Sequence, residues 1–136
     1  MSAWIKMLSN QEASENLTNL FNLVKTPHGT VDNVMRIHSL RPNTMKGHYT
    51  LYNSVLHDEE NCIPTWLQET ISSYVSILNN CEYSFANHWK NAEYLINDKK
   101  KSNLILKALK KKKLKSFFSG KELALLNYAE KLTLAP

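Results

Sequence analysis

Apolar residues recur at helical spacing along most of the chain. Ser9 and Glu12 have the spacing of a capping box, which marks the start of a helix. Behind them comes an apolar stripe at positions i, i+3, i+4 and i+7, made of Leu17, Leu20, Phe21 and Val24. This spacing places the four side chains on one face of an amphipathic helix. The following "TPHGT" segment predicts the end of that helix.

The same reading predicts further helices, separated by short polar breaks. Their expected positions are a short helix after Thr30, one from Pro42, one from Pro64 to about 78, and one from about Cys81 to Asn97. After a break at "NDKKKSN", a lysine-rich helix is expected over 102–118, and a last helix behind Ser119 and Glu122. The expected buried side chains of these last two helices are Ile105, Ala108, Leu109, Leu125, Leu126, Ala129 and Leu132. Because no strand alternation persists, the sequence predicts an all-α fold of about six or seven helices.

Length and composition narrow the setting of the protein. The chain has 136 residues, which predicts one compact domain over 1–136, and 43% of its residues are hydrophobic. No apolar run is long enough to cross a bilayer, and the N-terminal residues lack the pattern of a signal peptide. Two cysteines do not make a disulfide framework, so we expect free thiols in the cytoplasm.

The positive charge is concentrated in one segment. Residues 98–121 hold ten lysines and one acid, Asp98, a balance of +9, whereas the rest of the chain holds 7 basic and 11 acidic residues, a balance of −4. Clustered lysines can bind nucleic acid or an anionic membrane surface. The chain has few arginines to read bases, and no aromatic residues lie among these lysines. The sequence therefore favours a solvated helix face and disfavours nucleic acid as a partner.

A possible reactive site lies in "NNCEYSFANHW", residues 79–89. Cys81, Ser84 and His88 are three and four residues apart, which places them on one face of a helix. Cys81 lies near the helix N-terminus, where the helix dipole favours a thiolate, although the neighbouring Glu82 opposes it. Glu69 can approach the same face if its helix packs antiparallel to this one. A thiol, a histidine and a carboxylate together can form an activated nucleophile, but on spacing alone a buried cysteine and a structural histidine are the more common reading.

Residues 67–89, "LQETISSYVSILNNCEYSFANHW", resemble the carboxymuconolactone decarboxylase and alkylhydroperoxidase D superfamily, in particular its peroxidase-related branch. In that family a glutamate stands twelve residues before a Cys-x-x-Cys pair, and a histidine stands four after the second cysteine. Glu69, Cys81 and His88 match three of these four positions. "VMRIHSLRPNTMKGHYTLYNSVLH" is similar to the upstream helices of the branch, and "ELALLNYAEKLTLAP" is similar to its downstream segment.

The resemblance implies an alkylhydroperoxidase D-like helical fold, a homo-oligomer and a role in antioxidant defence. Redox members of the family reduce hydroperoxides with electrons from a thiol or dithiol protein, and need no cofactor. Their second cysteine attacks the peroxide and the first resolves the product as a disulfide, while the glutamate and histidine relay protons. Carried over, Cys81 takes the resolving position, with Glu69 and His88 as the relay.

The chain departs from the family pattern at two points. Ser84 takes the place of the attacking cysteine, and a hydroxyl cannot form a sulfenic acid or a disulfide. The two-cysteine cycle therefore cannot run within the motif, and activity is expected to be weak or lost. Family sequences also commonly continue past the "EKLTLAP" region. We expect a truncated copy, a split gene or a minimal form completed by a partner subunit.

Cys62 does not replace the missing thiol within one chain. It precedes the predicted helix that Cys81 follows, and fifteen helical residues span about 22 Å. A disulfide requires Cα atoms within about 7 Å, so only a bridge between subunits stays open. The remaining histidines, which are His28, His38, His48 and His57, show no metal-binding spacing, and we assign no metal.

Two hypotheses follow from the sequence. The first is a peroxidase-related protein whose remaining chemistry is one-cysteine redox at Cys81, recycled by an external thiol. The second is a non-catalytic helical oligomer that kept only the fold. The surroundings of Cys81 distinguish them, because the first needs an accessible thiol near His88 and Glu69 and the second does not.

Overall fold

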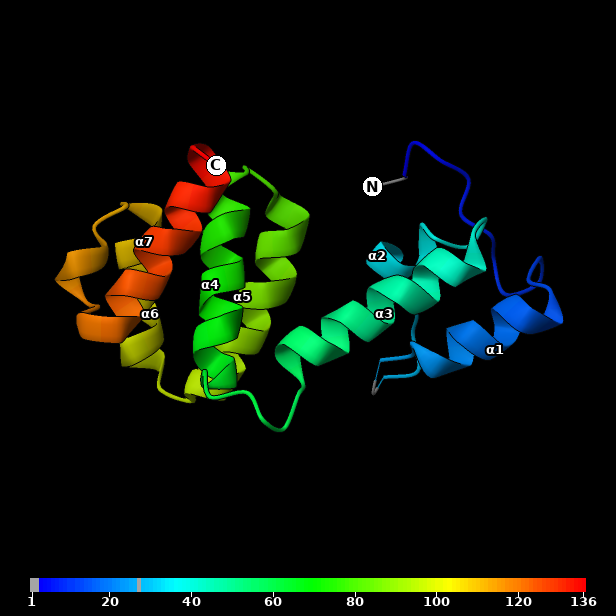
Figure 1. Cartoon of the computed structure of the whole chain (residues 1–136), viewed down its shortest axis with the longest axis horizontal. Helices are drawn as coiled ribbons and strands as arrows, with labels where there is room; N and C mark the ends of the chain where they lie inside the picture. Colours follow the sequence, from blue (N-terminus) through cyan, green and yellow to red (C-terminus); the bar gives the residue numbers. More distant parts are fainter. Residues whose placement is uncertain (1–2, 27) are drawn as a thin grey trace. The chain divides into compact units, whose positions relative to one another are not determined.

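The computed structural model describes residues 3–26 and 28–136, and within these ranges it contains helices and no strand (Figure 1). The helices are α1 (Glu15–Leu23), α2 (Asn33–Arg36), α3 (Pro42–Leu56), α4 (Thr65–Leu78), α5 (Glu82–Ile96), α6 (Lys99–Lys110), the short 3-10 helix η1 (Leu114–Ser116) and α7 (Gly120–Leu134). The predicted all-α fold of six or seven helices is confirmed. Among the described residues, no helix is both long and apolar enough to cross a membrane.

The chain divides into two compact units, Met1–Glu59 and Glu60–Pro136. The first unit contains α1 to α3, and the second contains the remaining helices. Each unit is described by itself below. The expectation of one domain over 1–136 stays a prediction.

The core of the N-terminal unit is formed where α1 and α2 meet α3. Its buried side chains are Leu17, Phe21, Val24, Met35 and Met45. The apolar stripe predicted from the sequence is therefore the buried face of α1, with Leu20 packed partly buried against the same cluster. Pro42 occupies the first turn of α3, as expected, because a helix leaves the N–H groups of its first turn without an internal partner.

The start of the first helix was wrongly predicted. Ser9 and Glu12 do exchange capping-box hydrogen bonds, at 2.9 and 3.3 Å, but only around a turn. The helix begins at Glu15, and the Ser14 hydroxyl accepts a bond from the Leu17 N–H. Ser14, five residues after Ser9 and nearer the apolar stripe, is the residue that caps the helix.

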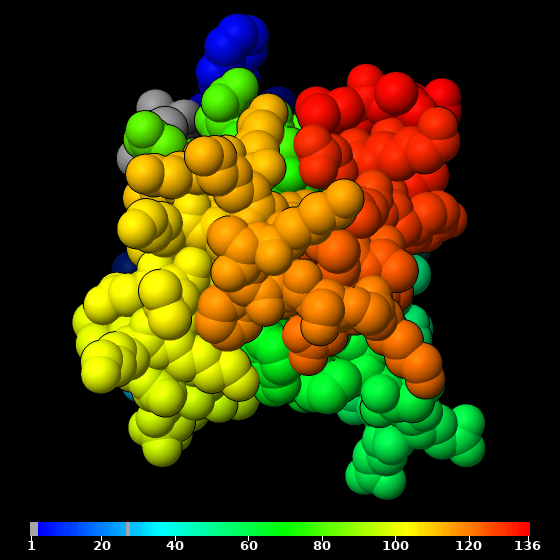
Figure 2. All heavy atoms as spheres, turned by 90° about the vertical axis from the view of Figure 1, so that its left-hand side faces the viewer, coloured from blue at the N-terminus to red at the C-terminus, as the bar shows by residue number. Residues whose placement is uncertain are grey.

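The C-terminal unit is built around α4, which contacts α5, α6 and α7. In Figure 1, α4 and α5 run side by side, with α7 against α4. Its core cluster contains Tyr74, Leu78, Trp89, Ala92, Ile105, Ala108, Leu109, Leu114, Phe118 and Leu126. The predicted buried residues of the lysine-rich segment are thus in the core, whereas Leu132 of α7 is 51% exposed against expectation. Figure 2 shows one side of this unit, where α6, η1 and α7 form the surface.

In the lysine-rich segment, the observed helix α6 is shorter and starts earlier than the helix predicted over 102–118. Asp98 caps α6 by accepting a hydrogen bond from the Lys101 N–H at 3.0 Å, so the expected polar break is part of the helix. The helix ends at Lys110, and Lys112 adopts the left-handed conformation with φ 52°. The Lys113 N–H then donates to the Ala108 carbonyl at 2.9 Å, which is the pattern of a Schellman motif.

Candidate functional site

The site is positioned by the hairpin of α4 and α5. The connection between them is only residues 79–81, so the two helices run antiparallel. Asn80 adopts the left-handed conformation with φ 52°, which Asn tolerates better than most residues. The Cys81 N–H donates to the Ser76 carbonyl at 2.9 Å and so closes the turn. The two helices thus meet the condition under which Glu69 can approach the face of Cys81, Ser84 and His88.

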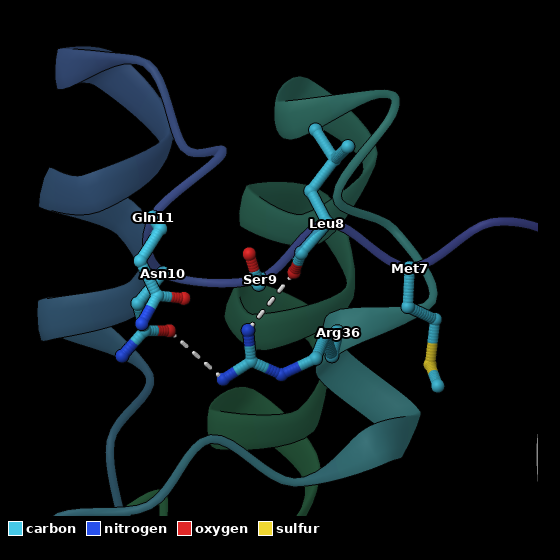
Figure 3. Close-up of a pocket in the computed structure, with 6 residues that line it drawn as sticks. All are labelled: Met7, Leu8, Ser9, Asn10, Gln11 and Arg36. Atoms are coloured by element: carbon cyan, nitrogen blue, oxygen red, sulfur yellow. Dashed lines mark hydrogen bonds between the residues drawn. The ribbon is translucent and has the colours of Figure 1, made fainter.

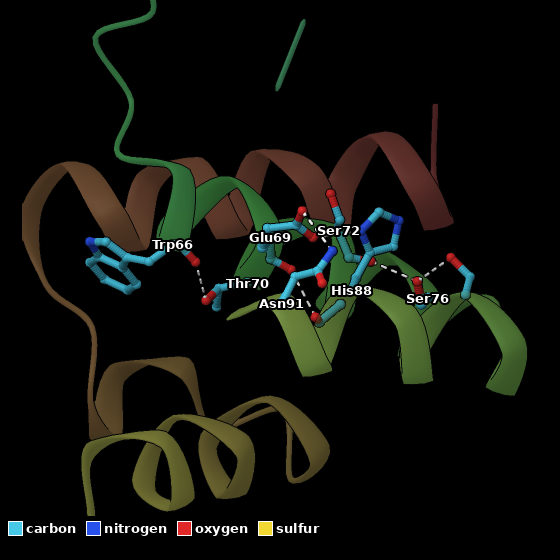
Figure 4. A network of polar contacts seen from close by, with 9 residues as sticks. Trp66, Glu69, Thr70, Ser72, Ser76, His88 and Asn91 are labelled. Carbon is cyan, nitrogen blue, oxygen red and sulfur yellow. Dashed lines mark hydrogen bonds and ion pairs between the residues drawn. The ribbon is translucent and has the colours of Figure 1, made fainter. Parts of the chain in front are cut away.

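Glu69 and His88 form the central contact of the site. Glu69 Oε2 lies 2.7 Å from His88 Nδ1, although the residues are 19 positions apart (Figure 4). The Glu69 side chain is 4% exposed and that of His88 is 28% exposed. An ionised carboxylate can only accept, so Nδ1 carries the hydrogen of this bond. Nε2 is thereby left as the ring nitrogen available for proton transfer.

Asn91 completes the surroundings of the buried carboxylate, and the sequence reading missed it. Its Nδ2 donates to Glu69 Oε1 at 3.3 Å, from one helical turn beyond His88. Each carboxylate oxygen therefore has a partner from α5. Such bonds offset the cost of burying a charge. The i, i+3 spacing of His88 and Asn91 was the only available signal, and an amide gives no chemical indication of a role.

Three buried hydroxyl side chains of α4 form hydrogen bonds within their own helix. Thr70, Ser73 and Ser76 of α4 each donate to the carbonyl four residues earlier, at 2.7 Å. Their hydroxyls are thus satisfied within α4 and do not compete for Glu69. All three residues are buried. The carboxylate consequently faces α5 with no hydroxyl of these three bonded to it.

Ser84 is bonded to α4 and not to the histidine. Its Oγ lies 2.8 Å from Ser76 Oγ. The Ser76 hydroxyl donates to Ser84 Oγ and also lies 2.7 Å from the Ser72 carbonyl, so these two acceptors share its one hydrogen. Within the described part of the chain, no hydrogen bond joins Ser84 Oγ to His88, so the geometry does not form an activated serine nucleophile.

A pocket of about 360 Å³ opens beside these side chains. Its lining consists of Ile71, Ser72, Val75, Ser76, Asn79, Cys81, Ser84 and His88. Cys81 is a free, exposed cysteine at the N-cap of α5. Three of the four predicted site residues thus line one pocket, and the fourth, Glu69, is bonded to the histidine of its wall.

A second pocket, of about 370 Å³, lies in the N-terminal unit and has a structural explanation (Figure 3). The Arg36 guanidinium donates to the Leu8 carbonyl at 3.0 Å and to Asn10 Oδ1 at 3.1 Å, and it lies 4.5 Å from the centre of the Phe21 ring. These contacts hold residues 8–10 against α2. We assign this pocket no chemistry, because its one hydroxyl, that of Ser9, accepts from the Glu12 N–H and no residue of the lining is a base that could activate it.

The sequence reading also missed a histidine pair in the N-terminal unit. His38 Nε2 lies 2.9 Å from His48 Nδ1, and His38 Nδ1 lies 3.1 Å from Thr44 Oγ1. Burial, and then the neighbouring His48, lower the pKa of His38. Within the described residues, no group of three or more histidine, cysteine or acidic side chains could hold a metal ion.

Comparison with known proteins adds no family to this picture. No family model matches the chain, and no curated protein matches it.

Proposed function

We propose that the chain is an alkylhydroperoxidase D-like, peroxidase-related protein that reduces hydroperoxides through the single thiol of Cys81. The contact between Glu69 and His88, 2.7 Å long and beside the pocket that Cys81 lines, carries the proposal. A histidine oriented by a buried carboxylate is a suitable proton relay for a thiol. The setting we propose is the cytoplasm, where a reducing environment keeps such a thiol free.

The proposed reaction begins when the Cys81 thiol gives its proton to His88 Nε2 and becomes a thiolate. Its sulfur attacks the terminal oxygen of the hydroperoxide, the O–O bond breaks, and the alkoxide leaves with the electron pair. A proton from His88 converts the alkoxide to an alcohol, and Cys81 becomes a sulfenic acid. An external thiol then attacks the sulfenic sulfur and releases water as a mixed disulfide forms. A second thiol releases Cys81 as the thiol and leaves with the first as a disulfide.

Ser84 makes this cycle slower than that of a two-cysteine enzyme. The serine hydroxyl cannot resolve the sulfenic acid, so every turnover depends on a collision with external thiol. Its hydrogen bond to Ser76 also ties the motif to α4. The activity should therefore rise in proportion to thiol concentration, without the saturation that an intramolecular resolving step gives.

The experiment is thiol-dependent turnover of cumene hydroperoxide by the wild type, Cys81→Ala and Cys62→Ala. Cys62 is the matched control, because it is also free and exposed. We expect the Cys81 variant to lose turnover and the Cys62 variant to retain it. Equal activity in all three proteins, or none in the wild type, would refute the enzymatic proposal.

A second candidate is a non-catalytic helical homo-oligomer. Large apolar side chains exposed on the C-terminal unit favour it, in particular Tyr94 (83%), Tyr128 (62%), Leu104 (54%) and Leu134 (53%). Oligomerisation is compatible with either candidate, since redox members of the resembled family also assemble. Light scattering tests it, and a stable monomer at micromolar concentration would contradict the oligomer. An oligomer without hydroperoxide turnover would favour this second candidate.

A further inference from the structure

The most highly charged surface of the chain is the lysine face, defined as the exposed lysines of α6, the following turn and η1. Eight of the nine lysines between residues 99 and 115 are exposed, and Lys101 is the partly buried one. Figure 2 shows the side of the molecule that this segment forms, in yellow and orange. No acid lies between residues 99 and 115, and the Asp98 carboxylate is already bonded as the helix cap. The charge of the face is therefore left almost without internal compensation.

Few of these lysines have a partner in the fold. Lys99 pairs with Glu93 at 2.6 Å, and Lys110 lies 5.4 Å from the centre of the Phe85 ring. In the part of the chain that the structure describes, Lys100, Lys107 and the lysines over 111–115 form no ion pair. The C-terminal dipole of α6 favours the cations of its last turn, but it does not reach as far as Lys115 or the first turn. Contacts within the folded chain thus do not explain why most of these lysines are present.

The backbone conformation of Lys112 is a second, independent indication that this segment is a functional surface. Its φ of 52° lies in the left-handed region, where a helix normally places glycine. A lysine at this position costs backbone energy and adds repulsion between neighbouring charges. A local rule broken without a gain in the folded chain is expected at a functional surface.

Against the expectation from the sequence, which favours a solvated face, we propose that the lysine face binds the phosphate backbone of double-stranded nucleic acid without sequence preference. Ile105, Ala108 and Leu109 are buried and Leu104 is the one exposed large apolar side chain of α6, so the helix has no continuous apolar face to insert into a membrane. No aromatic residue lies between 99 and 116 to stack on single-stranded bases, and no arginine is present there to read base edges. The only feature of this face that can bind a partner is therefore its positive charge, which matches the regular negative charge of a duplex backbone.

The dimensions agree with this partner. The twelve residues of α6 span about 18 Å. A duplex carries one charge per about 1.7 Å of its axis, so that length presents roughly ten phosphates. Four of the eight exposed lysines, Lys99, Lys100, Lys107 and Lys110, lie on α6, and the other four follow it, so the phosphates along this length are enough to pair with the lysines of the helix. This inference stands apart from the proposed peroxidase function and uses none of its residues.

The test is binding of the full chain to a fluorescent duplex of about 20 base pairs, measured by anisotropy between about 50 and 200 mM salt. The first variant carries Lys107→Gln, Lys111→Gln, Lys112→Gln and Lys113→Gln. The control variant removes four exposed lysines outside the face, with Lys25→Gln, Lys46→Gln, Lys90→Gln and Lys131→Gln. Both variants have the same net charge, so only the position of the charge differs.

We expect the wild type to bind, with an affinity that falls steeply with salt. The first variant should lose at least about tenfold in affinity, and its log–log salt slope should fall by roughly 3 to 4, while the control stays near the wild type. Lys112→Gly keeps the backbone conformation and should weaken binding by a smaller factor. Equal losses in both four-fold variants, or absent duplex binding, would overturn the proposal. Vesicles of phosphatidylserine and phosphatidylcholine test the alternative partner, an anionic membrane surface. Binding to these vesicles without binding to the duplex would also overturn the proposal.

Discussion

Replacing His88 with alanine should destabilise the C-terminal unit through the carboxylate that it leaves behind. The Glu69 side chain is 4% exposed and would keep only the 3.3 Å bond from Asn91. Leaving a buried group without its hydrogen-bond partner costs about 1–3 kcal/mol, and more when that group is charged. The His88 side chain is 28% exposed, so water can reach part of the vacated space. We therefore expect the free energy of unfolding at pH 7 to fall by about 2 kcal/mol.

The assay is urea unfolding followed by tryptophan fluorescence in a Trp4→Phe background. The signal then comes from Trp66 and Trp89, which both lie in the C-terminal unit. Adding Glu69→Gln to His88→Ala removes the stranded charge and should recover about 1 kcal/mol. A loss below about 0.5 kcal/mol for His88→Ala, or no recovery in the double variant, would refute the reasoning. Either result would mean that the carboxylate does not depend on the histidine.

Three more predictions concern other positions. Lys112→Gly should raise the free energy of unfolding by about 1 kcal/mol in the same assay, because glycine adopts the left-handed conformation without strain; no gain would contradict that strain. Because the pKa of His38 is lowered in the folded chain, its neutral form contributes stability above the unfolded value, and this is lost as pH falls below about 6.5. The amide protection factors of the N-terminal unit, which are corrected for the slower intrinsic exchange in acid, should therefore fall on acidification, and fall less in His38→Gln; identical profiles would count against the pair with His48. Ser84→Cys should form an intramolecular disulfide with Cys81 after peroxide treatment, seen by mass spectrometry as the loss of two hydrogens, and should raise dithiol-dependent turnover; a folded variant without either would show that the site has decayed further.

The helices around the site could be predicted because their signals are local. Pro64 begins the helical pattern of α4, two asparagines mark its end, and a polar–apolar pattern of the right period follows in α5. Two helices joined by so short a turn must be antiparallel. The contact between Glu69 and His88 then follows from their positions along the two helices.

Other contacts could not be predicted because they depend on long-range packing or on competition between similar signals. The pair of His38 and His48 forms only because the end of α2 turns back onto α3. The bond between Ser76 and Ser84 depends on how closely the helices approach. The predicted start of α6 was wrong because the capping signal of Asp98 lay within a segment that resembled a polar break.

The central claim, that His88 and Glu69 activate Cys81, is tested most directly by comparing the two cysteines in one molecule. Wild-type protein is treated with limiting hydroperoxide in the presence of dimedone, and adducts at Cys81 and Cys62 are quantified by mass spectrometry. Both thiols are exposed, so accessibility alone predicts similar rates. The account predicts that Cys81 reacts at least about tenfold faster than Cys62 and that His88→Ala removes most of the difference. Equal rates at the two cysteines, or a preference for Cys81 that persists in His88→Ala, would contradict it.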